Sequence, residues 1–573
     1  MLIMKKIIYS ALVILTGLVY ACSSDWLEIK PKGQGSFETV SSKQGVKVLL
    51  IGAYAVVDGS HRGFGDGAVW ASSVSNWVWG SVASDDAYKG SDFGDQSTIN
   101  PVEGFYADAS NGYVTNHWFP FYDGITRTND VLKALKLAKD MTDAEKSLAE
   151  AQAKFLRAHF YVELTRVHGK VPYIDENTEN PTVVPNDVDI WPKIEADMKF
   201  AADNLPATWS DKGRATKWAA KTYLAYIYMF QKKYDLAKPL LDEVYTSGGF
   251  TLMPSFEQNY MIANRNNTES IFEIQYAVND GTSGSMNAGW GDALLFPQGS
   301  AGMGTCCGFF QPSHSLVSAY RVDANGLPLL DEVYSTASIL PFDATGATVP
   351  YTNPVDPRLD HTVGRPGIPY LDWGVHQGNA WIRDPANGGP YLYKKNMFKK
   401  SEKALATSTG WATGVNANNF RKFRKAHVIL WLAECEAQIG SLAKATSLVN
   451  EIRSRAKASN VVKFDNGTPA ANYKVEPYPV TFASKDYALK AIKEEIRMEF
   501  AMEGLRFYDL VRWGDAGPVI NKYLQVEGTK MPHLTGKAFV PGQHEIWPVP
   551  QTQIDMSIDA TGKKVLTQNP GYN

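Results

Sequence analysis

Two loop-rich stretches of the chain combine tryptophan rings with carboxylate, amide and guanidinium side chains. A sugar presents apolar C–H faces that can pack on a flat ring, and polar edges that can bond to such planar groups. For any single tryptophan the alternative is a ring that anchors its own loop to the core, but we expect at least one of the group to face a ligand. The predicted ligand-binding residues are Trp77, Trp79, Asp85 and Asp86 in one stretch, and Trp290, Asp292, Asp372, Trp373, Asn379, Trp381 and Arg383 in the other.

Motifs with the spacing of known catalytic sites are absent from the sequence. His544 and Glu545 have no second histidine at the spacing of a zinc protease, and no phosphate-binding loop or nucleophile elbow occurs. The two carboxylates of a glycosidase need not be close in sequence, so the 60 Asp and Glu residues leave that activity open. We predict no catalytic residue and no cofactor, with an undetected glycoside hydrolase as an alternative.

The densest acidic loop runs from residue 84 to residue 92. Calcium takes oxygen ligands, but this loop lacks the glycine and the final glutamate of an EF-hand at their usual places. The alternative is that these carboxylates accept hydrogen bonds from nearby backbone amides. We predict the capping role and no metal site, although the sequence leaves a calcium ion open.

The N-terminus has the layout of a lipoprotein signal. Lys5 and Lys6 precede a short apolar run that ends at Ala21, and Cys22 follows directly. Such a thiol can carry diacylglycerol, whereas ordinary secretion would need no cysteine there. Two or three acyl chains make a membrane attachment effectively permanent. We predict a signal peptide over residues 1–21 and lipidation at Cys22, with a tether over residues 22–47.

The composition describes a folded protein with no bias toward nucleic acid. Of the 573 residues, 44% are apolar and 12% aromatic, which excludes a disordered chain. Lys and Arg total 57 against 60 Asp and Glu, so the net charge is −3 and no nucleic-acid partner is expected. No segment after the signal reaches 18 apolar residues, so the mature chain should sit on a membrane without crossing it.

The helical periodicity of the sequence predicts the helices that hold the candidate loops in place. Thr142 and Glu145 form a capping box, and apolar residues then recur at three- and four-residue steps until Gly169 ends the helix. Pairs of helices with short turns, similar to tetratricopeptide units, are expected on both sides of the loop-rich centre. The expected helical ranges are 48–57, 142–168, 220–227, 240–244, 421–437, 445–456 and 489–500.

Long irregular stretches separate these helices. Residues 58–123 and 248–419 are rich in Gly, Asn and Asp, and their aromatic residues argue against disorder. The predicted fold is therefore mainly α, with tetratricopeptide-like helical hairpins packed against an irregular loop-rich region that holds a few short strands. Trp218 stands on a helical stripe, which predicts a core position for its ring.

Several long motifs have a familiar form. Residues 155–161 read FLRAHFY, residues 492–514 read IKEEIRMEFAMEGLRFYDLVRWG, and IWPVPQ and QNPGY follow at 546–551 and 568–572. Together they resemble the SusD/RagB family of nutrient-binding lipoproteins of Bacteroidota outer membranes. The charged residues of the signature are interpreted as an ion-pair scaffold that fixes the helices, since arginine pairs with carboxylates in a defined geometry. They are Glu495, Arg497, Glu499, Glu503, Arg506 and Arg512.

The resemblance implies a function as well as a fold. It implies a lipid-anchored, surface-exposed outer-membrane protein that binds oligosaccharide, contributes no catalysis and partners a SusC-like TonB-dependent barrel. A peptide- or glycopeptide-binding protein of the same fold is the alternative. The resemblance also implies two regions after the tether, an N-terminal helical region at 48–247 and a C-terminal region at 248–573 with a loop-rich ligand-binding insertion at 248–419.

Overall fold

Helices dominate the computed structural model, which describes residues 37–60, 69–282, 285–298, 307–330, 348–406 and 415–572. Strands are short and form three two-stranded antiparallel sheets within these ranges. This confirms the predicted fold class. None of the helices in the described ranges is long and apolar enough to cross a membrane. The sheets pair β1 (Ala87–Gly90) with β3 (Phe309–Pro312), β2 (Ser270–Ile274) with β6 (Phe420–Arg424), and β4 (Val363–Gly364) with β5 (Leu392–Tyr393).

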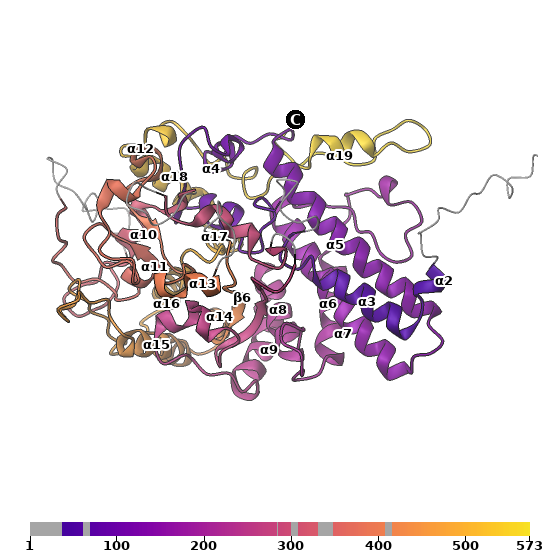
Figure 1. Cartoon of the computed structure of the whole chain (residues 1–573), viewed down its shortest axis with the longest axis horizontal. Helices are drawn as coiled ribbons and strands as arrows, with labels where there is room; N and C mark the ends of the chain where they lie inside the picture. Colours follow the sequence, from indigo (N-terminus) through magenta and orange to yellow (C-terminus); the bar gives the residue numbers. More distant parts are fainter. Residues whose placement is uncertain are drawn as a thin grey trace, which may run out of the picture.

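The N-terminal half is an array of helices in which each packs against the next along the chain (Figure 1). Helix α3 lies against α5 and α6, and α9 at the far end of the array lies against α14 of the C-terminal half. The helices of the array are α3 (Lys43–Tyr54), α5 (Gly112–Leu137), α6 (Asp143–His168), α7 (Trp191–Asn204), α8 (Lys217–Phe230) and α9 (Tyr234–Ser247).

Helices return after the loop-rich centre and continue this packing. Helix α14 contacts both α15 and α16, and α17 packs on α18. The short helix α19 lies beyond them in the C-terminal segment. Their bounds are α14 (Lys425–Ile439), α15 (Leu442–Ala458), α16 (Lys485–Phe500), α17 (Arg506–Trp513), α18 (Ala516–Glu527) and α19 (Gln551–Met556).

Local signals explain where two of these helices begin. The capping box predicted for α6 is present, because Thr142 accepts from the backbone of Glu145 while the Glu145 carboxylate accepts from the backbone of Thr142. Helix α5 is not among the expected helices; it begins after Asn111, whose side chain accepts from the N–H of Tyr113 at 2.9 Å. The prediction of an irregular stretch up to residue 123 is therefore wrong beyond Asn111.

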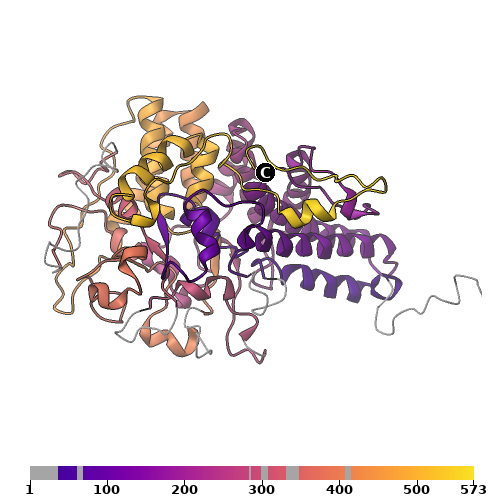
Figure 2. The same ribbon diagram turned by 90° about the horizontal axis from the view of Figure 1, so that it is seen from above.

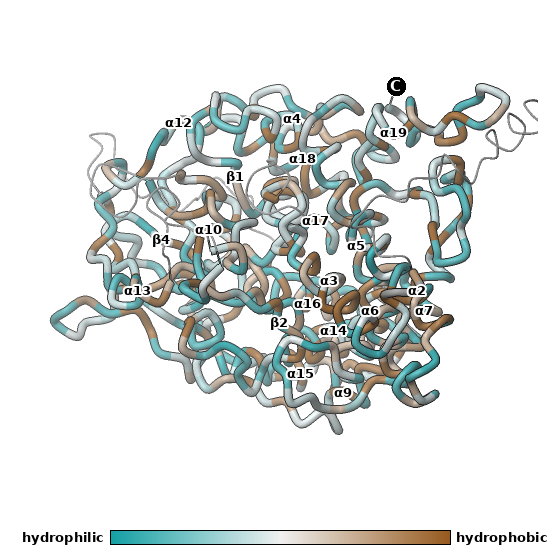
Figure 3. Tube along the Cα trace, turned by 45° about the vertical axis from the view of Figure 1, so that its right-hand side comes forward, coloured by the Kyte–Doolittle hydropathy of each residue, from teal (hydrophilic) through white to brown (hydrophobic). Residues whose placement is uncertain are grey.

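Two large hydrophobic cores support the molecule. One lies among the helices, and the other lies under the loop-rich region and includes residues of α17 and α18. Apolar segments gather around α6 and α14 in Figure 3, whereas the projecting loops are mostly hydrophilic. The C-terminal segment crosses over the N-terminal helices (Figure 2), where Trp547 donates its backbone N–H to Val167 and Asn569 donates to His168. The C-terminal segment is thus tied to the N-terminal helices.

A buried cluster of charged side chains connects the helices to the loop-rich centre. Its central carboxylate, Glu499, pairs with Arg358, Arg424 and Arg455, and all four side chains are at most 4% exposed. We call this set the ion cluster; it contains five cationic residues, Arg358, Lys395, Arg424, Arg453 and Arg455, and five acidic residues, Glu269, Asp356, Glu495, Glu499 and Glu503.

The scaffold interpretation of the signature is confirmed, but its charged residues find most of their partners far away in the chain. Glu499 and Glu503 bond to Arg424 at the end of β6, and Arg512 forms a two-pronged pair with Glu434 of α14. Arg497 reaches the acidic loop near residue 85. The signature therefore joins segments that are distant in sequence.

Candidate ligand-binding site

The predicted residues of the first stretch have a structural role, beginning with its two tryptophans. The rings of Trp77 and Trp79 are each 1% exposed, in a wide helical turn over residues Trp77–Val82. The Nε1 of Trp77 donates to the Gly291 carbonyl at 3.1 Å, and that of Trp79 donates to the Ala71 carbonyl at 2.6 Å. Since sugar stacking needs an accessible ring face, this burial contradicts the predicted ligand contact.

The two acidic residues of this group are also buried. Asp85 pairs with Arg497 at 3.0 Å and with Arg506 at 2.8 Å, and Asp86 pairs with Arg497 at 2.9 Å. Each carboxylate is at most 1% exposed, so a ligand cannot reach its oxygens and its prediction as a ligand contact is wrong. In the same loop Asp92 accepts from the backbone N–H groups of Gly94 and Asp95, which confirms the capping interpretation for that residue.

The second group is only partly accessible. Trp290 is 4% exposed and donates its Nε1 to the Ser285 carbonyl. Trp381 is 3% exposed and lies against His376 with ring centroids 5.4 Å apart. These two rings are loop anchors, which contradicts their predicted role. Asp292 is half-buried: desolvation raises the pKa of its carboxylate, which accepts from two serine hydroxyls, and its ligand contact stays a prediction.

Trp373 is the most accessible ring of the second group. It is half-buried, and its Nε1 donates to the Phe398 carbonyl at 3.1 Å. The Trp373 ring meets the Phe296 ring edge-on, with centroids 5.6 Å apart. Part of the indole is therefore held by the loop-rich region while the rest reaches solvent, and its ligand contact stays a prediction.

Three polar residues of the second group also keep exposed atoms, and their ligand contacts stay a prediction too. Arg383 pairs with Asp92 and Asp95, each at 2.5 Å, and Asn379 is exposed. Asp372 is exposed as well. Of the predicted residues, Asp372 is the one that lines the largest cavity described below.

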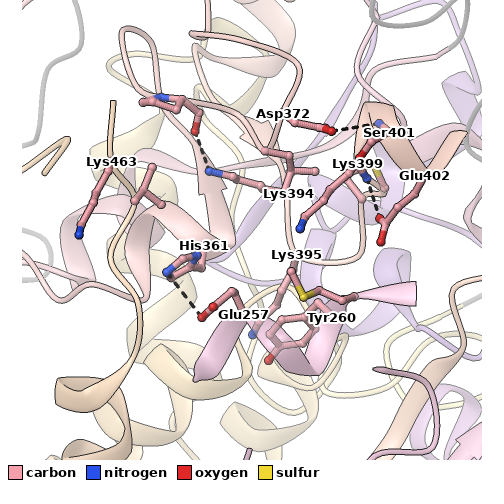
Figure 4. Close-up of a pocket in the computed structure, with 15 residues that line it drawn as sticks. Glu257, Tyr260, His361, Asp372, Lys394, Lys395, Lys399, Ser401, Glu402 and Lys463 are labelled. Atoms are coloured by element: carbon pink, nitrogen blue, oxygen red, sulfur yellow. Dashed lines mark hydrogen bonds and ion pairs between the residues drawn. The ribbon is translucent and has the colours of Figure 1, made fainter. Parts of the chain in front are cut away.

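The cavity beside Asp372 has a volume of about 440 Å³, within the range of small-ligand pockets. We call it the loop cavity. It is assembled from several segments of the chain, and its lining mixes apolar walls with groups that donate and accept hydrogen bonds (Figure 4). The lining residues are Glu257, Tyr260, Met261, His361, Pro369, Leu371, Asp372, Lys394, Lys395, Met397, Lys399, Ser401, Glu402, Val462 and Lys463.

The floor of the loop cavity is held by the ion cluster. Lys395 donates to the carbonyls of Glu499 and Ala501, at 2.8 and 2.9 Å, and to Glu503 at 2.6 Å. The Tyr260 hydroxyl donates to the same Glu503 carboxylate at 3.0 Å. Burial lowers the pKa of Lys395 to about 8, although Glu503 opposes that shift. The polar ends of both side chains are occupied, so the floor is rigid.

The rim of the loop cavity offers acceptors that are already oriented. Asp372 accepts from the backbone N–H groups of Lys400 and Ser401, at 2.5 and 3.0 Å. Burial alone would raise the pKa of Asp372, but the hydrogen bonds from Ser401 and Lys400 lower it. On the opposite side, the Glu257 carboxylate lies 3.9 Å from the His361 Nε2, and the pKa of His361 is lowered mainly by burial. An ionised Asp372 is unsuited to act as a general acid.

The rim also carries cationic donors. Neither Lys399 nor Lys463 has an ion pair or a hydrogen bond from its ammonium group to a residue in the described ranges. Lys394, by contrast, donates to the Asp360 and Pro369 carbonyls. With acceptors, available donors and apolar walls together, the loop cavity can hold a ligand that has both hydroxyl groups and an apolar face.

Most of the residues around this cavity carry no local signal in the sequence. Asp372 is among the predicted residues, but Glu257, His361 and Lys463 stand in segments without a motif or a periodic pattern. The run of lysines at residues 394, 395, 399 and 400 is the one signal that could have drawn attention to the rim. Even that signal does not tell the structural Lys395 from the accessible Lys399.

Comparisons with known proteins give this architecture a context. A model of the SusD family matches residues 268–572, and a model described as "Starch-binding associating with outer membrane" matches residues 25–229. A SusD-like protein of Bacteroides ovatus is 31% identical over 30% of this chain and 34% of its own length. SusD-like protein P2 of Formosa agariphila is 26% identical over 89% of this chain and 91% of its own.

Solved structures show the same fold. A laminarin-binding SusD-like protein has a TM-score of 0.66 and 23% identity, covering 93% of this chain and 100% of that one. A surface glycan-binding protein A from Bacteroides thetaiotaomicron, in complex with laminarihexaose, has a TM-score of 0.63 and 22% identity, covering 92% and 99%. Because the SusD model matches more than half of the sequence, the chain belongs to the SusD family.

Proposed function

We propose that the protein is a cell-surface lipoprotein that captures oligosaccharide and delivers it to a SusC-like TonB-dependent transporter in the outer membrane, without catalysing a reaction. Family membership supports the binding role, and the second family model is described by starch and by the outer membrane. The signal-like N-terminus and Cys22, which lie outside the described residues, support the lipid anchor.

The observation that carries the proposal is the loop cavity. Its rim combines the ionised Asp372 with the ammonium groups of Lys399 and Lys463, and its walls include Leu371 and Met261. Sugar hydroxyls can both donate to the carboxylate and accept from the lysines, while the C–H face packs on the apolar wall. The rigid floor reduces the ordering that binding requires.

A blocking substitution tests the proposal. Ser401 is exposed at the rim, so Ser401→Trp should fill the cavity while leaving the core intact. We expect it to remove the loop-cavity binding step for laminarihexaose or maltohexaose in isothermal titration calorimetry. The matched control is Ser447→Trp, an exposed position on α15 that lines neither cavity, which should bind as wild type does.

The same titrations distinguish the alternatives. Binding without new reducing ends supports a binding protein, and release of reducing ends would establish a hydrolase. Binding of a peptide mixture in place of either hexaose would favour the peptide-binding alternative. If Ser401→Trp binds glycan with wild-type affinity, the loop cavity is not the site.

A further inference from the structure

A second cavity, of about 370 Å³, lies on the helical half of the molecule. It opens between the connection from α7 to α8, the end of α9 and the start of β2, and α8 and α9 lie side by side at the lower centre of Figure 1. We call it the indole groove and define it by five lining residues, Trp209, Trp218, Phe250, Asn266 and Glu273.

Two indole rings in this groove are fixed in place by their neighbours. The Nε1 of Trp209 donates to the Ala215 carbonyl at 2.7 Å, and the Arg214 guanidinium lies 5.6 Å from the ring centroid. Trp218 is 8% exposed and has the Lys217 ammonium 4.4 Å from its ring centroid. Trp209 is half-buried. Rings that are already ordered lose little conformational entropy when a ligand packs on them.

The groove also contains a buried carboxylate, that of Glu273, with one oxygen that accepts no hydrogen bond among the described residues. Glu273 is 3% exposed, and its Oε2 accepts from the Asn266 N–H at 2.8 Å and from Asn419 at 2.9 Å. Its Oε1 forms an ion pair with Arg421, whose Nε lies 3.6 Å away, and it accepts no hydrogen bond among the described residues. A buried carboxylate oxygen without a donor is costly, so a ligand hydroxyl that donates to it would be favoured.

We propose that the indole groove is a second carbohydrate subsite, which takes a neutral pyranose unit with its apolar face on the rings and a hydroxyl donated to Glu273. This proposal rests on the proposed glycan-binding function. A neutral sugar is favoured over an acidic one, because the ligand must donate a hydrogen bond to a carboxylate rather than bring a second negative charge beside it. The two cavities share no lining residue.

Fluorine NMR of protein labelled with 5-fluorotryptophan tests the second subsite. The Trp209 resonance is assigned with Trp209→Phe, a change that keeps a ring at that position. Titration with laminarihexaose and maltohexaose should shift this resonance saturably in wild type and also in Ser401→Trp, whose loop cavity is blocked. The Trp191 resonance, from a half-buried ring outside the groove, should stay unchanged and serves as the control.

A second variant measures the energetic role of the ring. Trp209→Ala should weaken binding at the groove by roughly ten- to a hundredfold, since it removes the ring face that the ligand would cover. A Trp209 resonance that neither hexaose moves would overturn the subsite. A different result would separate the two proposals. If glycan shifts the Trp209 resonance and Ser401→Trp keeps wild-type glycan affinity, the groove is a binding site and the loop cavity is not.

Discussion

Replacement of Glu499 by glutamine tests whether the signature is a scaffold or a binding site. Glu499 is fully buried, and burial alone would raise its pKa, but Arg455, Arg424 and Arg358 hold that pKa well below its usual range. Glutamine keeps the shape of the side chain and removes its charge. The ion cluster would then hold five cations and four anions.

The size of the effect follows from the burial. Removal of one partner from a buried ion pair costs about 3–5 kcal/mol, because the remaining charges lose their compensation without regaining water. Most domains are stable by only ~5–15 kcal/mol, so the loss should be easy to measure. The expected result for Glu499→Gln is a decrease of that size in the free energy of unfolding.

Urea unfolding followed by circular dichroism measures this change, and calorimetry on the folded variant measures glycan affinity. Affinity should stay near wild type, since Lys395 is anchored on the Glu499 carbonyl and not on its carboxylate. The control is Asp203→Asn, which breaks an exposed pair with Lys199 and should cost at most about 1 kcal/mol. A Glu499→Gln variant that is as stable as this control, or one that folds normally and loses glycan binding, would refute the scaffold interpretation.

Three further outcomes are expected. Trp77→Ala should destabilise the protein by about 3–5 kcal/mol in the same urea assay, since it empties a buried ring site, and an unchanged stability would contradict the core position. Cys22→Ala should release the protein from membranes in cell fractionation, and unchanged membrane association in a strain lacking the partner barrel would reject the lipid anchor. Stability should fall on acidification: the Glu503 pKa is lowered to about 2 from 4.5, because Arg424 and Lys395 outweigh its burial, so its contribution is complete above pH 4.5 and is lost toward pH 2. A free energy of unfolding that is constant from pH 5 to pH 3 would contradict this.

The helices could be predicted because their signals are local. The capping box at Thr142 and the apolar steps after it identify α6 without reference to the rest of the chain. The start of α5 carries a local signal too, since Asn111 is a good capping residue, but the aromatic residues that follow it are also typical of a loop. A local sequence pattern is therefore sufficient to predict a helix where the pattern has only one interpretation.

Ring exposure could not be predicted in the same way. Trp77 and Trp79 stand among small and polar residues, yet a second hydrophobic core lies under that region and buries both of them. The helical stripe of Trp218 correctly predicts its burial among the helices, but it does not reveal that the ring also lines a groove. A loop sequence does not reveal which core lies beneath it, because that core is made of distant segments.

The relation between the ion cluster and the loop cavity explains why one signature can accompany different ligands. Lys395 and Tyr260 have their polar ends in the cluster and also line the cavity floor, so the scaffold fixes the base of the proposed site. The ammonium groups of the rim residues Lys399 and Lys463 make no described contact with that scaffold, and substitutions there should leave the cluster intact. Ligand choice can therefore change at the rim without loss of the fold, and a family signature in the scaffold predicts that a site exists but not which sugar it takes.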